Sequence, residues 1–225
     1  ERINDIFQME NEVTENQLYN PIPRNTEISF QKVSFRYNDQ GKDAICQVSF
    51  KIPEGKTTAL VGDSGCGKTT IINLILGVLT PTEGKILIHG TSLSLLNKDL
   101  WRKECGVVMQ DGFVFNDTIA GNIALGHEEI DYQKIMTAIH TASLSKEMEL
   151  FPSGVNTVVG EKGRGLSTGQ KQRLLIARAI YKNPALFLFD EATNSLDANN
   201  EKNILNNLTS CLKNKTVIVA AHRLS

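Results

Sequence analysis

The chain has 225 residues, of which 40% are hydrophobic and 22% are charged, and its formal net charge is -1. This composition is sufficient for a packed core and argues against a disordered, low-complexity protein. The near-neutral charge argues against a broad basic face that binds nucleic acid. The longest mostly apolar run, at positions 71–79, is well short of the roughly 20 residues that a transmembrane helix needs.

The ends of the chain and its cysteines indicate a segment of a longer protein in a reducing setting. Residues 1–24 are polar and acidic and finish with two prolines, which is typical of a linker. No initiator methionine is present, so we expect this linker to follow another domain. The cysteines are far apart in sequence, which predicts neither a zinc site nor a disulfide framework; they are Cys46, Cys66, Cys105 and Cys211.

The order of strand-like and helix-like segments predicts an α/β fold. Residues 28–37 and 44–52 alternate apolar and polar residues, which predicts an antiparallel β pair near the N-terminus. Residues 116–153 have helical spacing and predict a mainly helical insertion. Short apolar runs alternate with helix-length stretches, which predicts a mostly parallel central sheet; these runs are 57–62, 85–90, 106–110, 185–190 and 216–222.

The sequence GDSGCGKTT at positions 62–70 follows one of these strands and opens an apolar helix. It fits the phosphate-binding pattern GxxxxGK[ST] in its proper strand, loop and helix context. The glycines allow successive N–H groups to point at phosphate oxygens, and the helix dipole adds to that attraction. Lys68 would contact the outer phosphates, and the Thr69 hydroxyl would bind Mg²⁺. The predicted nucleotide-binding residues of this loop are Gly62, Asp63, Ser64, Gly65, Cys66, Gly67, Lys68, Thr69 and Thr70.

Cys66 lies inside this loop and has two interpretations. It can be a replacement for serine without a redox role, or a thiol activated by the helix terminus. The sequence alone leaves both open.

A second part of the predicted site lies at the end of the apolar run 185–190. Asp190 and Glu191 follow this run, and ligands of parallel-sheet proteins gather at the carboxyl ends of strands. We therefore expect Asp190 to help hold Mg²⁺ and Glu191 to polarise the water that attacks the terminal phosphate.

The segment LSTGQ at positions 166–170 precedes a predicted helix over 170–182. By itself it is an ordinary helix start with Ser167 as the N-cap. Together with other segments it carries a family resemblance. Residues 26–225 resemble the nucleotide-binding domain of an ATP-binding cassette (ABC) transporter; the segments that carry this resemblance, in order, are 62–70, Gln110, 166–170, 186–191, 195–197 and His222.

The resemblance implies a P-loop NTPase core, an N-terminal antiparallel β subdomain and a helical subdomain over about 112–178 that contains residues 166–170. It also implies that residues 166–170 complete the ATP site of a second copy, so that two copies pair head to tail around two MgATP. Ser167, Thr168, Gly169 and Gln170 would then contact nucleotide from the opposite side. Thr168 stands where the family usually has glycine, and its side chain could either hinder closure or donate to a phosphate.

Other roles follow from the resemblance alone. Tyr37 would stack on adenine, and Gln110 would reach Mg²⁺ and the attacking water while its loop touches a membrane-spanning partner. His222 would contact the terminal phosphate, and Asp197 would communicate across the dimer. Glu161 would belong to a loop that contacts the transmembrane domains of exporters.

The function implied is that of an ATPase motor in an exporter, at the cytoplasmic face of a bacterial inner membrane and attached to transmembrane domains of the same polypeptide. Bacterial peptide exporters, some with a peptidase domain, look most similar. A soluble ABC-type ATPase acting on DNA or the ribosome and an importer subunit are the alternatives; without a long coiled coil or basic arm, no nucleic-acid partner is expected. Relatives continue beyond His222, so we expect the sequence to be truncated at its C-terminus.

Overall fold

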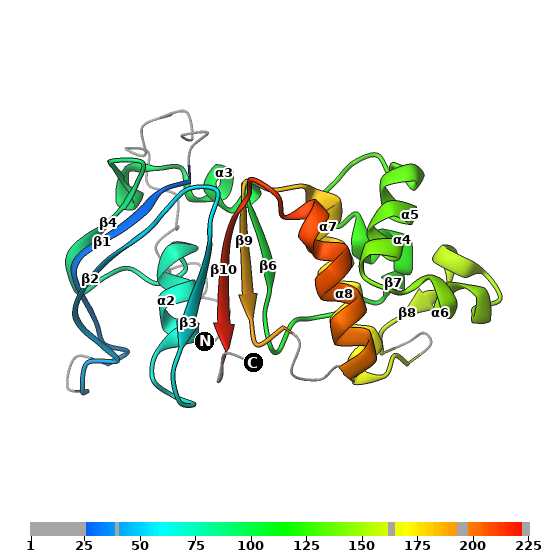
Figure 1. The fold of residues 1–225 in the computed structure, drawn as a ribbon, viewed down its shortest axis with the longest axis horizontal. Helices are drawn as coiled ribbons and strands as arrows, with labels where there is room; N and C mark the ends of the chain where they lie inside the picture. Colours follow the sequence, from blue (N-terminus) through cyan, green and yellow to red (C-terminus); the bar gives the residue numbers. More distant parts are fainter. Residues whose placement is uncertain (1–25, 39–40, 162–164, 193–197, 222–225) are drawn as a thin grey trace, which may run out of the picture.

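The computed structural model describes residues 26–38, 41–161, 165–192 and 198–221. The expected linker, the turn at 195–197 and His222 lie outside these ranges. Three blocks are visible in Figure 1: an antiparallel sheet, a parallel sheet beside it, and a group of helices on the far side of the parallel sheet. The expected α/β fold class is confirmed.

The antiparallel sheet has the order β2-β1-β4-β5. Its strands are β1 (Ile28–Phe35), β2 (Ile45–Ile52), β4 (Glu83–Ile88) and β5 (Thr91–Ser92). β1 pairs with β2 as expected, with Ile28 opposite Ile52. Alternate residues of this sheet face the helix α2 (Lys68–Ile75), which lies between the two sheets in Figure 1.

One expectation about the sheets is wrong. The run 85–90 was expected in the parallel sheet, but β4 pairs antiparallel with β1 and places Ile88 opposite Ile28. The physical reason lies in the burial of its side chains, because Ile86 and Ile88 are buried whereas Lys85 is exposed. Such one-sided burial is typical of a sheet with one solvated face.

The parallel sheet has the order β3-β10-β9-β6. Its strands are β3 (Thr57–Val61), β6 (Cys105–Val108), β9 (Leu186–Asp190) and β10 (Thr216–Ala221). In β9, Leu186 and Leu188 belong to the core shared with α2, whereas Phe187 and Phe189 belong to the core shared with the helical block. Helices and a second sheet cover both faces, which explains why this strand is apolar at every position from 186 to 189.

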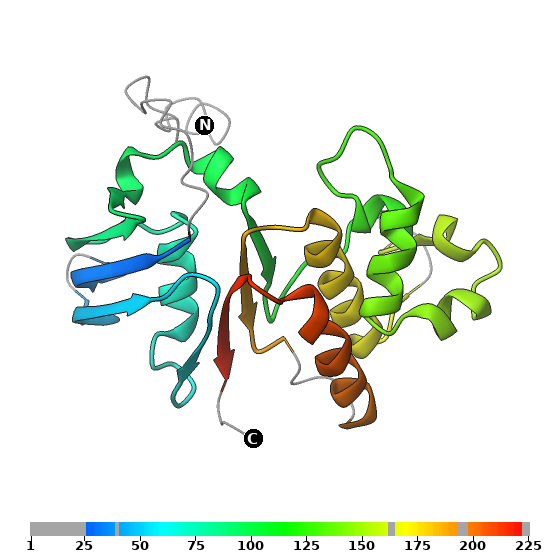
Figure 2. The ribbon, with the colours of Figure 1, turned by 45° about the horizontal axis from the view of Figure 1, so that its top comes forward.

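The helical block contains α4 (Ile119–Ile123), α5 (Tyr132–Thr141), α6 (Ser145–Leu150) and α7 (Thr168–Lys182). A two-residue ladder of β7 (Asp117–Thr118) with β8 (Val158–Val159) closes its base, a pairing that the helical spacing did not predict. The helix α8 (Ala198–Cys211) lies between β9 and β10 in the chain, and α3 (Lys98–Lys103) precedes β6. Figure 2 shows α7 and α8 side by side on this flank of the parallel sheet.

Candidate nucleotide site

The loop at 62–67 connects β3 to α2, and two of its glycines are required by the backbone. Gly65 has φ 78° and Gly67 has φ 98°, both in the left-handed region that side chains disfavour. A Cβ at Gly67 would also lie 2.7 Å from Cδ1 of Ile45 and 3.1 Å from the carbonyl oxygen of Ala44. The loop therefore packs against the start of β2 and turns directly into α2.

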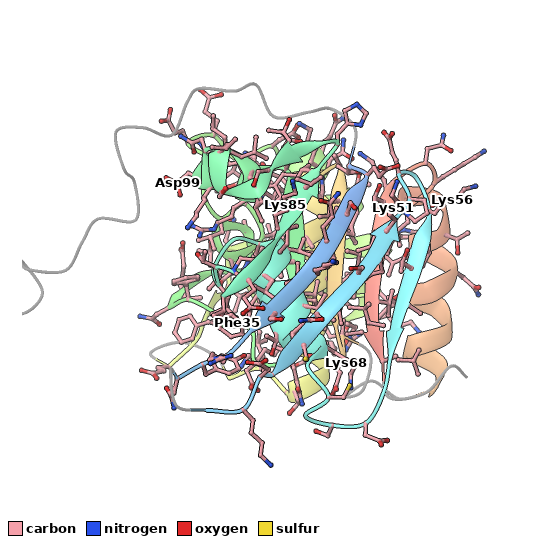
Figure 3. All side chains as sticks on the ribbon, turned by 90° about the vertical axis from the view of Figure 1, so that its left-hand side faces the viewer. Phe35, Lys51, Lys56, Lys68, Lys85 and Asp99 are labelled. Carbon is pink, nitrogen blue, oxygen red and sulfur yellow. The ribbon has the colours of Figure 1, made fainter. Side chains whose placement is uncertain are left out.

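Lys68 is the first residue of α2 and lies folded into this loop. Its Nζ donates hydrogen bonds to the carbonyl oxygens of Gly62, at 2.7 Å, and Asp63, at 2.9 Å, and its side chain is 7% exposed. The Sγ atom of Cys66 lies 3.9 Å from the same nitrogen. The ammonium group is thus positioned inside the curve of the loop, where a phosphate would meet it. Figure 3 shows Lys68 at the end of the parallel sheet where the strands finish.

Thr69 and Asp190 meet in front of the loop. Thr69 Oγ1 donates a 2.7 Å hydrogen bond to Asp190 Oδ2, and Asp190 is 2% exposed. Burial raises the pKa of Asp190 above its ordinary value of 3.8, and the negative charges of Glu191 and Asp111 add to this effect. The hydrogen bond from Thr69 and the charge of Lys68 act in the opposite direction. A hydroxyl beside a desolvated carboxylate with further acids nearby is a donor set that fits Mg²⁺.

Glu191 has an unusual backbone conformation. Its φ is 51°, in the left-handed region, and its N–H donates to the carbonyl oxygen of Ala220 at 3.1 Å. A non-glycine residue held in this region costs free energy, and such residues cluster at functional sites. The sharp turn ends β9 and separates Glu191 from the strand that holds Asp190.

The register of the parallel sheet brings the other expected residues to the same edge. Val61, the last residue of β3, lies opposite Ala221 of β10, and Asp190 lies opposite Ala220. Val108, two residues before Gln110, lies opposite Phe189 of β9. Gln110 is exposed just beyond that edge. The loop 62–67, Gln110, Asp190 and Glu191 therefore share the carboxyl edge of the sheet, where ligands of such folds bind.

Tyr37 lies over the first turn of α2. Its hydroxyl is 3.0 Å from Oγ1 of Thr70, and its ring meets Phe35 edge-on with centroids 4.9 Å apart. The side chain remains 61% exposed, so an aromatic surface is available beside the loop. This placement is compatible with the expected stacking on a base.

Residues 166–170 lie elsewhere. Ser167 is the N-cap of α7, as expected: its Oγ accepts from the N–H of Gln170 at 3.2 Å, and Oε1 of Gln170 accepts from the N–H of Ser167 at 3.0 Å. This reciprocal capping box engages the carbonyl end of the Gln170 side chain, which sequence reasoning assigned to nucleotide alone. Ser167 and Thr168 are exposed.

The loop and α7 lie beside opposite edge strands of the parallel sheet. The loop follows β3 at one edge, whereas α7 packs against β6 at the other edge. Figure 1 shows β10 and β9 between them. Among the described residues, no hydrogen bond or ion pair joins 166–170 to 62–69.

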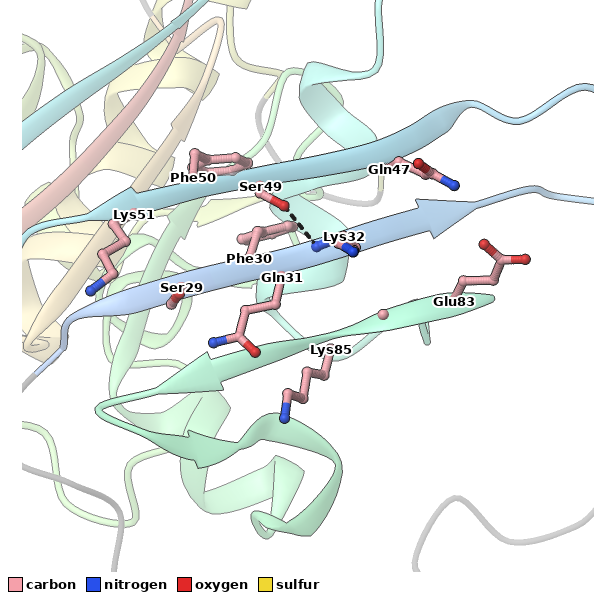
Figure 4. Close-up of a pocket in the computed structure, with 11 residues that line it drawn as sticks. Ser29, Phe30, Gln31, Lys32, Gln47, Ser49, Phe50, Lys51, Glu83 and Lys85 are labelled. Carbon is pink, nitrogen blue, oxygen red and sulfur yellow. Dashed lines mark hydrogen bonds between the residues drawn. The ribbon is translucent and has the colours of Figure 1, made fainter.

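A large open hollow of about 940 Å³ occupies the outer face of the antiparallel sheet and does not belong to this site. Figure 4 shows its lining, in which the N–H of Lys32 donates to Ser49 Oγ at 2.8 Å. The lining contains none of the expected nucleotide-binding residues. Its exposed lysines, Lys32, Lys51 and Lys85, are strand residues directed to solvent.

Comparison with known proteins agrees with this geometry. A family profile described as ABC transporter matches residues 45–194. The lipid A-core flippase of Cupriavidus pinatubonensis is 40% identical over 202 residues, covering 88% of this chain and 34% of the flippase. ABC transporter B family member 13 of Arabidopsis thaliana is 43% identical over 198 residues, covering 88% of this chain and 16% of the relative. A solved bacterial Atm1-family ABC exporter with ATP bound superimposes with a TM-score of 0.91 at 35% identity, over 99% of this chain and 39% of the exporter.

These matches define the class as an ABC-type ATPase domain. The chain belongs to the ABC transporter family, whose ATPase domains use MgATP, and the family resemblance expected from its motifs is confirmed. It spans about a third of the length of the flippase that it matches. Within the ranges that the structure describes, no helix has the length and apolar character to cross a membrane.

Two polar residues of the helical block are not predicted by any motif in the sequence. Arg178 and Asn122 hold the segment after Gln110 against α7. A signal was present, because Arg178 stands between Ala177 and Ala179 in the otherwise apolar run LLIARAIY, and a cation in such a run usually has partners.

Proposed function

We propose that this chain is the ATP-hydrolysing motor of an ABC exporter and that it works as a head-to-tail pair. In that pair, the loop 62–69 of each copy faces residues 166–170 of the other, with MgATP between them. The observation that carries this proposal is the separation of the loop 62–69 from residues 166–170 within one chain. The loop offers one set of phosphate-binding groups, and the capped start of α7, a helix that packs on the other edge strand β6, offers a second set with exposed Ser167 and Thr168.

Hydrolysis in this proposal uses groups at the carboxyl edge of the sheet. Glu191 accepts a proton from a water molecule as the water oxygen bonds to the terminal phosphorus, and the bond from that phosphorus to the bridging oxygen breaks. ADP and inorganic phosphate are the products. Lys68 holds the phosphate oxygens, and Thr69, Asp190 and Gln110 would hold Mg²⁺. When bound, Mg²⁺ neutralises charge on the phosphates.

An exposed apolar surface supports an attached transmembrane partner. Phe113 is 60% exposed and Phe115 is 43% exposed, and both follow Gln110 closely. A groove of about 310 Å³ lies nearby between α7 and β6, and exposed Val78 and Leu125 line it. Apolar patches of this kind mark interaction sites. We infer that a cytoplasmic segment of the transmembrane domains contacts this surface, which places the ATPase at the cytoplasmic face of the membrane.

The names of relatives bear on direction and cargo. They describe a flippase of lipid A-core and an Atm1-family exporter, which favours export. None of these names refers to a peptide, so we infer an amphiphilic lipid-like cargo ahead of the peptide suggested by sequence resemblance. Stimulation of ATPase activity in the reconstituted full-length transporter by lipid A-type lipids, and not by peptides, is the expected result. The reverse selectivity would contradict this inference.

The pairing is tested with Glu191→Gln, which keeps the site but removes the base. With saturating MgATP, light scattering coupled to size-exclusion chromatography should show twice the monomer mass, because bound nucleotide is no longer consumed. Glu191→Gln combined with Ser167→Asp should remain monomeric, because a negative charge would face the phosphates. A monomer that retains bound MgATP in the single variant would contradict the shared site.

A further inference from the structure

A fully buried asparagine fixes the segment that follows Gln110. The side-chain oxygen of Asn122, which is 0% exposed, accepts from the N–H of Phe115 at 2.8 Å. Its Nδ2 donates to the carbonyl oxygens of Phe115, at 2.9 Å, and Thr118, at 3.0 Å. Both ends of the amide are thus satisfied by the backbone of a single loop, which locks its shape.

All three guanidinium nitrogens of Arg178, on α7, donate hydrogen bonds to Phe113 or Asn122. Nε donates to the carbonyl oxygen of Asn122 at 2.8 Å, Nη2 to Asn122 Oδ1 at 3.0 Å, and Nη1 to the carbonyl oxygen of Phe113 at 2.9 Å. The guanidinium carbon also lies 5.6 Å from the ring centroid of Phe115. Burial lowers the pKa of Arg178, consistent with a cation removed from water. A planar fork with several donors suits these divergent acceptors, and a lysine could not reproduce it.

A second cation of α7 holds the opposite flank of the same stretch. Nζ of Lys182 donates to the carbonyl oxygens of Arg102, at 2.6 Å, and Cys105, at 2.7 Å. Arg102 lies near the end of α3, and Cys105 is the first residue of β6, the strand that leads to Gln110. The stretch from β6 through Gln110 to Phe115 is therefore tied to α7 at both of its ends.

The helix α7 connects Arg178 and Lys182 to its N-cap residue, Ser167. It runs without a break for 15 residues from the capping box at Ser167. A helix of that length is about 22 Å long, at about 1.5 Å per residue, and behaves as a rod. A helix that moves as a rod would carry a displacement of Arg178 to Ser167.

We propose that Arg178 is a positioning residue that makes α7 and the segment 113–118 one moving body, so that contact at Phe113 and Phe115 moves Ser167. This inference rests on the proposed function, because Ser167 acts there on the nucleotide of the second copy. Arg178 touches neither nucleotide nor water in this scheme. Arg178 couples the movement of Phe113 and Phe115 to that of residues 166–170.

The test is amide hydrogen exchange on the Glu191→Gln protein with and without MgATP. Exchange should slow by about tenfold at 166–172, where nucleotide closes the pair, and by a similar factor at 113–118, although that segment contacts no nucleotide. In Glu191→Gln with Arg178→Lys, slowing at 166–172 should persist, while the factor at 113–118 should fall below about twofold.

The factor by which MgATP slows exchange at 113–118 distinguishes coupling of the two segments from simple stabilisation of the loop. If Arg178 only stabilised the loop, the variant would raise the basal exchange of 113–118 but leave the MgATP-induced factor intact, which would overturn the proposal. Lys182→Met is the matched control: the bonds of Lys182 go to Arg102 and Cys105, ahead of Gln110, rather than to 113–118, so its loss should leave the factor at 113–118 unchanged. An absence of slowing at 166–172 in the parent protein would instead contradict the shared site itself.

A second measurement needs no substitution at Arg178. In the Glu191→Gln protein, slowing at 113–118 and at 166–172 should have the same midpoint in a MgATP titration, since the two segments move as one body. Midpoints that differ by tenfold or more would show independent motion and overturn the proposal. This result remains informative even if Arg178→Lys fails to fold.

Discussion

Thr69 and Asp190 are 121 positions apart in the sequence, yet the Thr69 hydroxyl donates to the Asp190 carboxylate at 2.7 Å. This hydrogen bond joins the start of α2 to the end of β9 and places a donor hydroxyl beside an acceptor carboxylate oxygen. Because burial raises the pKa of Asp190, the ionised carboxylate is destabilised in the nucleotide-free fold.

Replacing Asp190 with asparagine should therefore have opposite effects with and without ligand. A raised carboxyl pKa in the fold means that this group contributes most to stability below pH 3.8, the ordinary value, and that the contribution is lost as the pH rises through the folded pKa. Nucleotide-free Asp190→Asn should accordingly gain stability relative to the parent chain at pH 8, and gain less at pH 5. Urea unfolding at the two pH values measures this difference.

The same variant should lose its response to MgATP. A ligand at a hundred times its Kd stabilises the parent chain by about 2.7 kcal/mol, whereas Asp190→Asn should gain little because the carboxylate for Mg²⁺ is missing. A variant that keeps the full MgATP-induced shift of the unfolding midpoint would show that Asp190 does not hold the metal.

Lys68→Ala should weaken ATP binding by at least about tenfold, because it deletes the cation that lies inside the phosphate loop. Isothermal titration calorimetry measures the change. Lys56→Ala is the matched control, since Lys56 is exposed at the opposite end of β3 and should leave the affinity unchanged. Equal affinities for the two variants would contradict the assignment of Lys68.

Two substitutions at Ser167 separate helix capping from nucleotide binding. Ser167→Ala should lower the free energy of unfolding by about 1 kcal/mol, because it removes the acceptor for the N–H of Gln170. Ser167→Asp should stay within a few tenths of a kcal/mol of the parent chain, because aspartate is also a good N-cap. The parent chain should hydrolyse ATP at a rate that rises faster than linearly with protein concentration, and both variants should lose this hydrolysis. Normal hydrolysis by Ser167→Asp would mean that this helix start does not meet phosphate.

Variants of Tyr37 test the aromatic surface beside the loop. Tyr37→Phe loses only the contact with Thr70 and should bind ATP within about threefold of the parent chain, whereas Tyr37→Ala should lose about 1–3 kcal/mol of binding free energy. GTP should follow ATP closely in all three proteins, since stacking needs only a π surface. Unchanged affinity in Tyr37→Ala would place the base elsewhere.

Much of the fold and the arrangement of one half of the site follow from the sequence for local reasons. Glycine spacing, the adjacent lysine and threonine, and an apolar strand that ends in two acids each specify their surroundings within a few residues. The Ser167 cap is equally local, because serine three positions before glutamine forms the capping box by itself.

The remainder depends on tertiary context. Residues 85–88 follow a helix, as a parallel strand would, and only their one-sided burial against α2 explains the pairing of β4 with β1. The grip of Arg178 on Phe113 spans 65 positions, and no short motif encodes it. The strained turn at Glu191 also escaped prediction, since nothing in its residue type favours a left-handed backbone.

Leucine and phenylalanine alternate along β9, and this alternation also opposes slippage of the strand. A shift of this strand by a single residue would exchange leucines and phenylalanines between two differently shaped cores, and both would then be mispacked. Slippage is therefore opposed from both faces at once. The position of Asp190 along the strand axis is set by the hydrophobic side chains behind it and does not depend on a ligand being present.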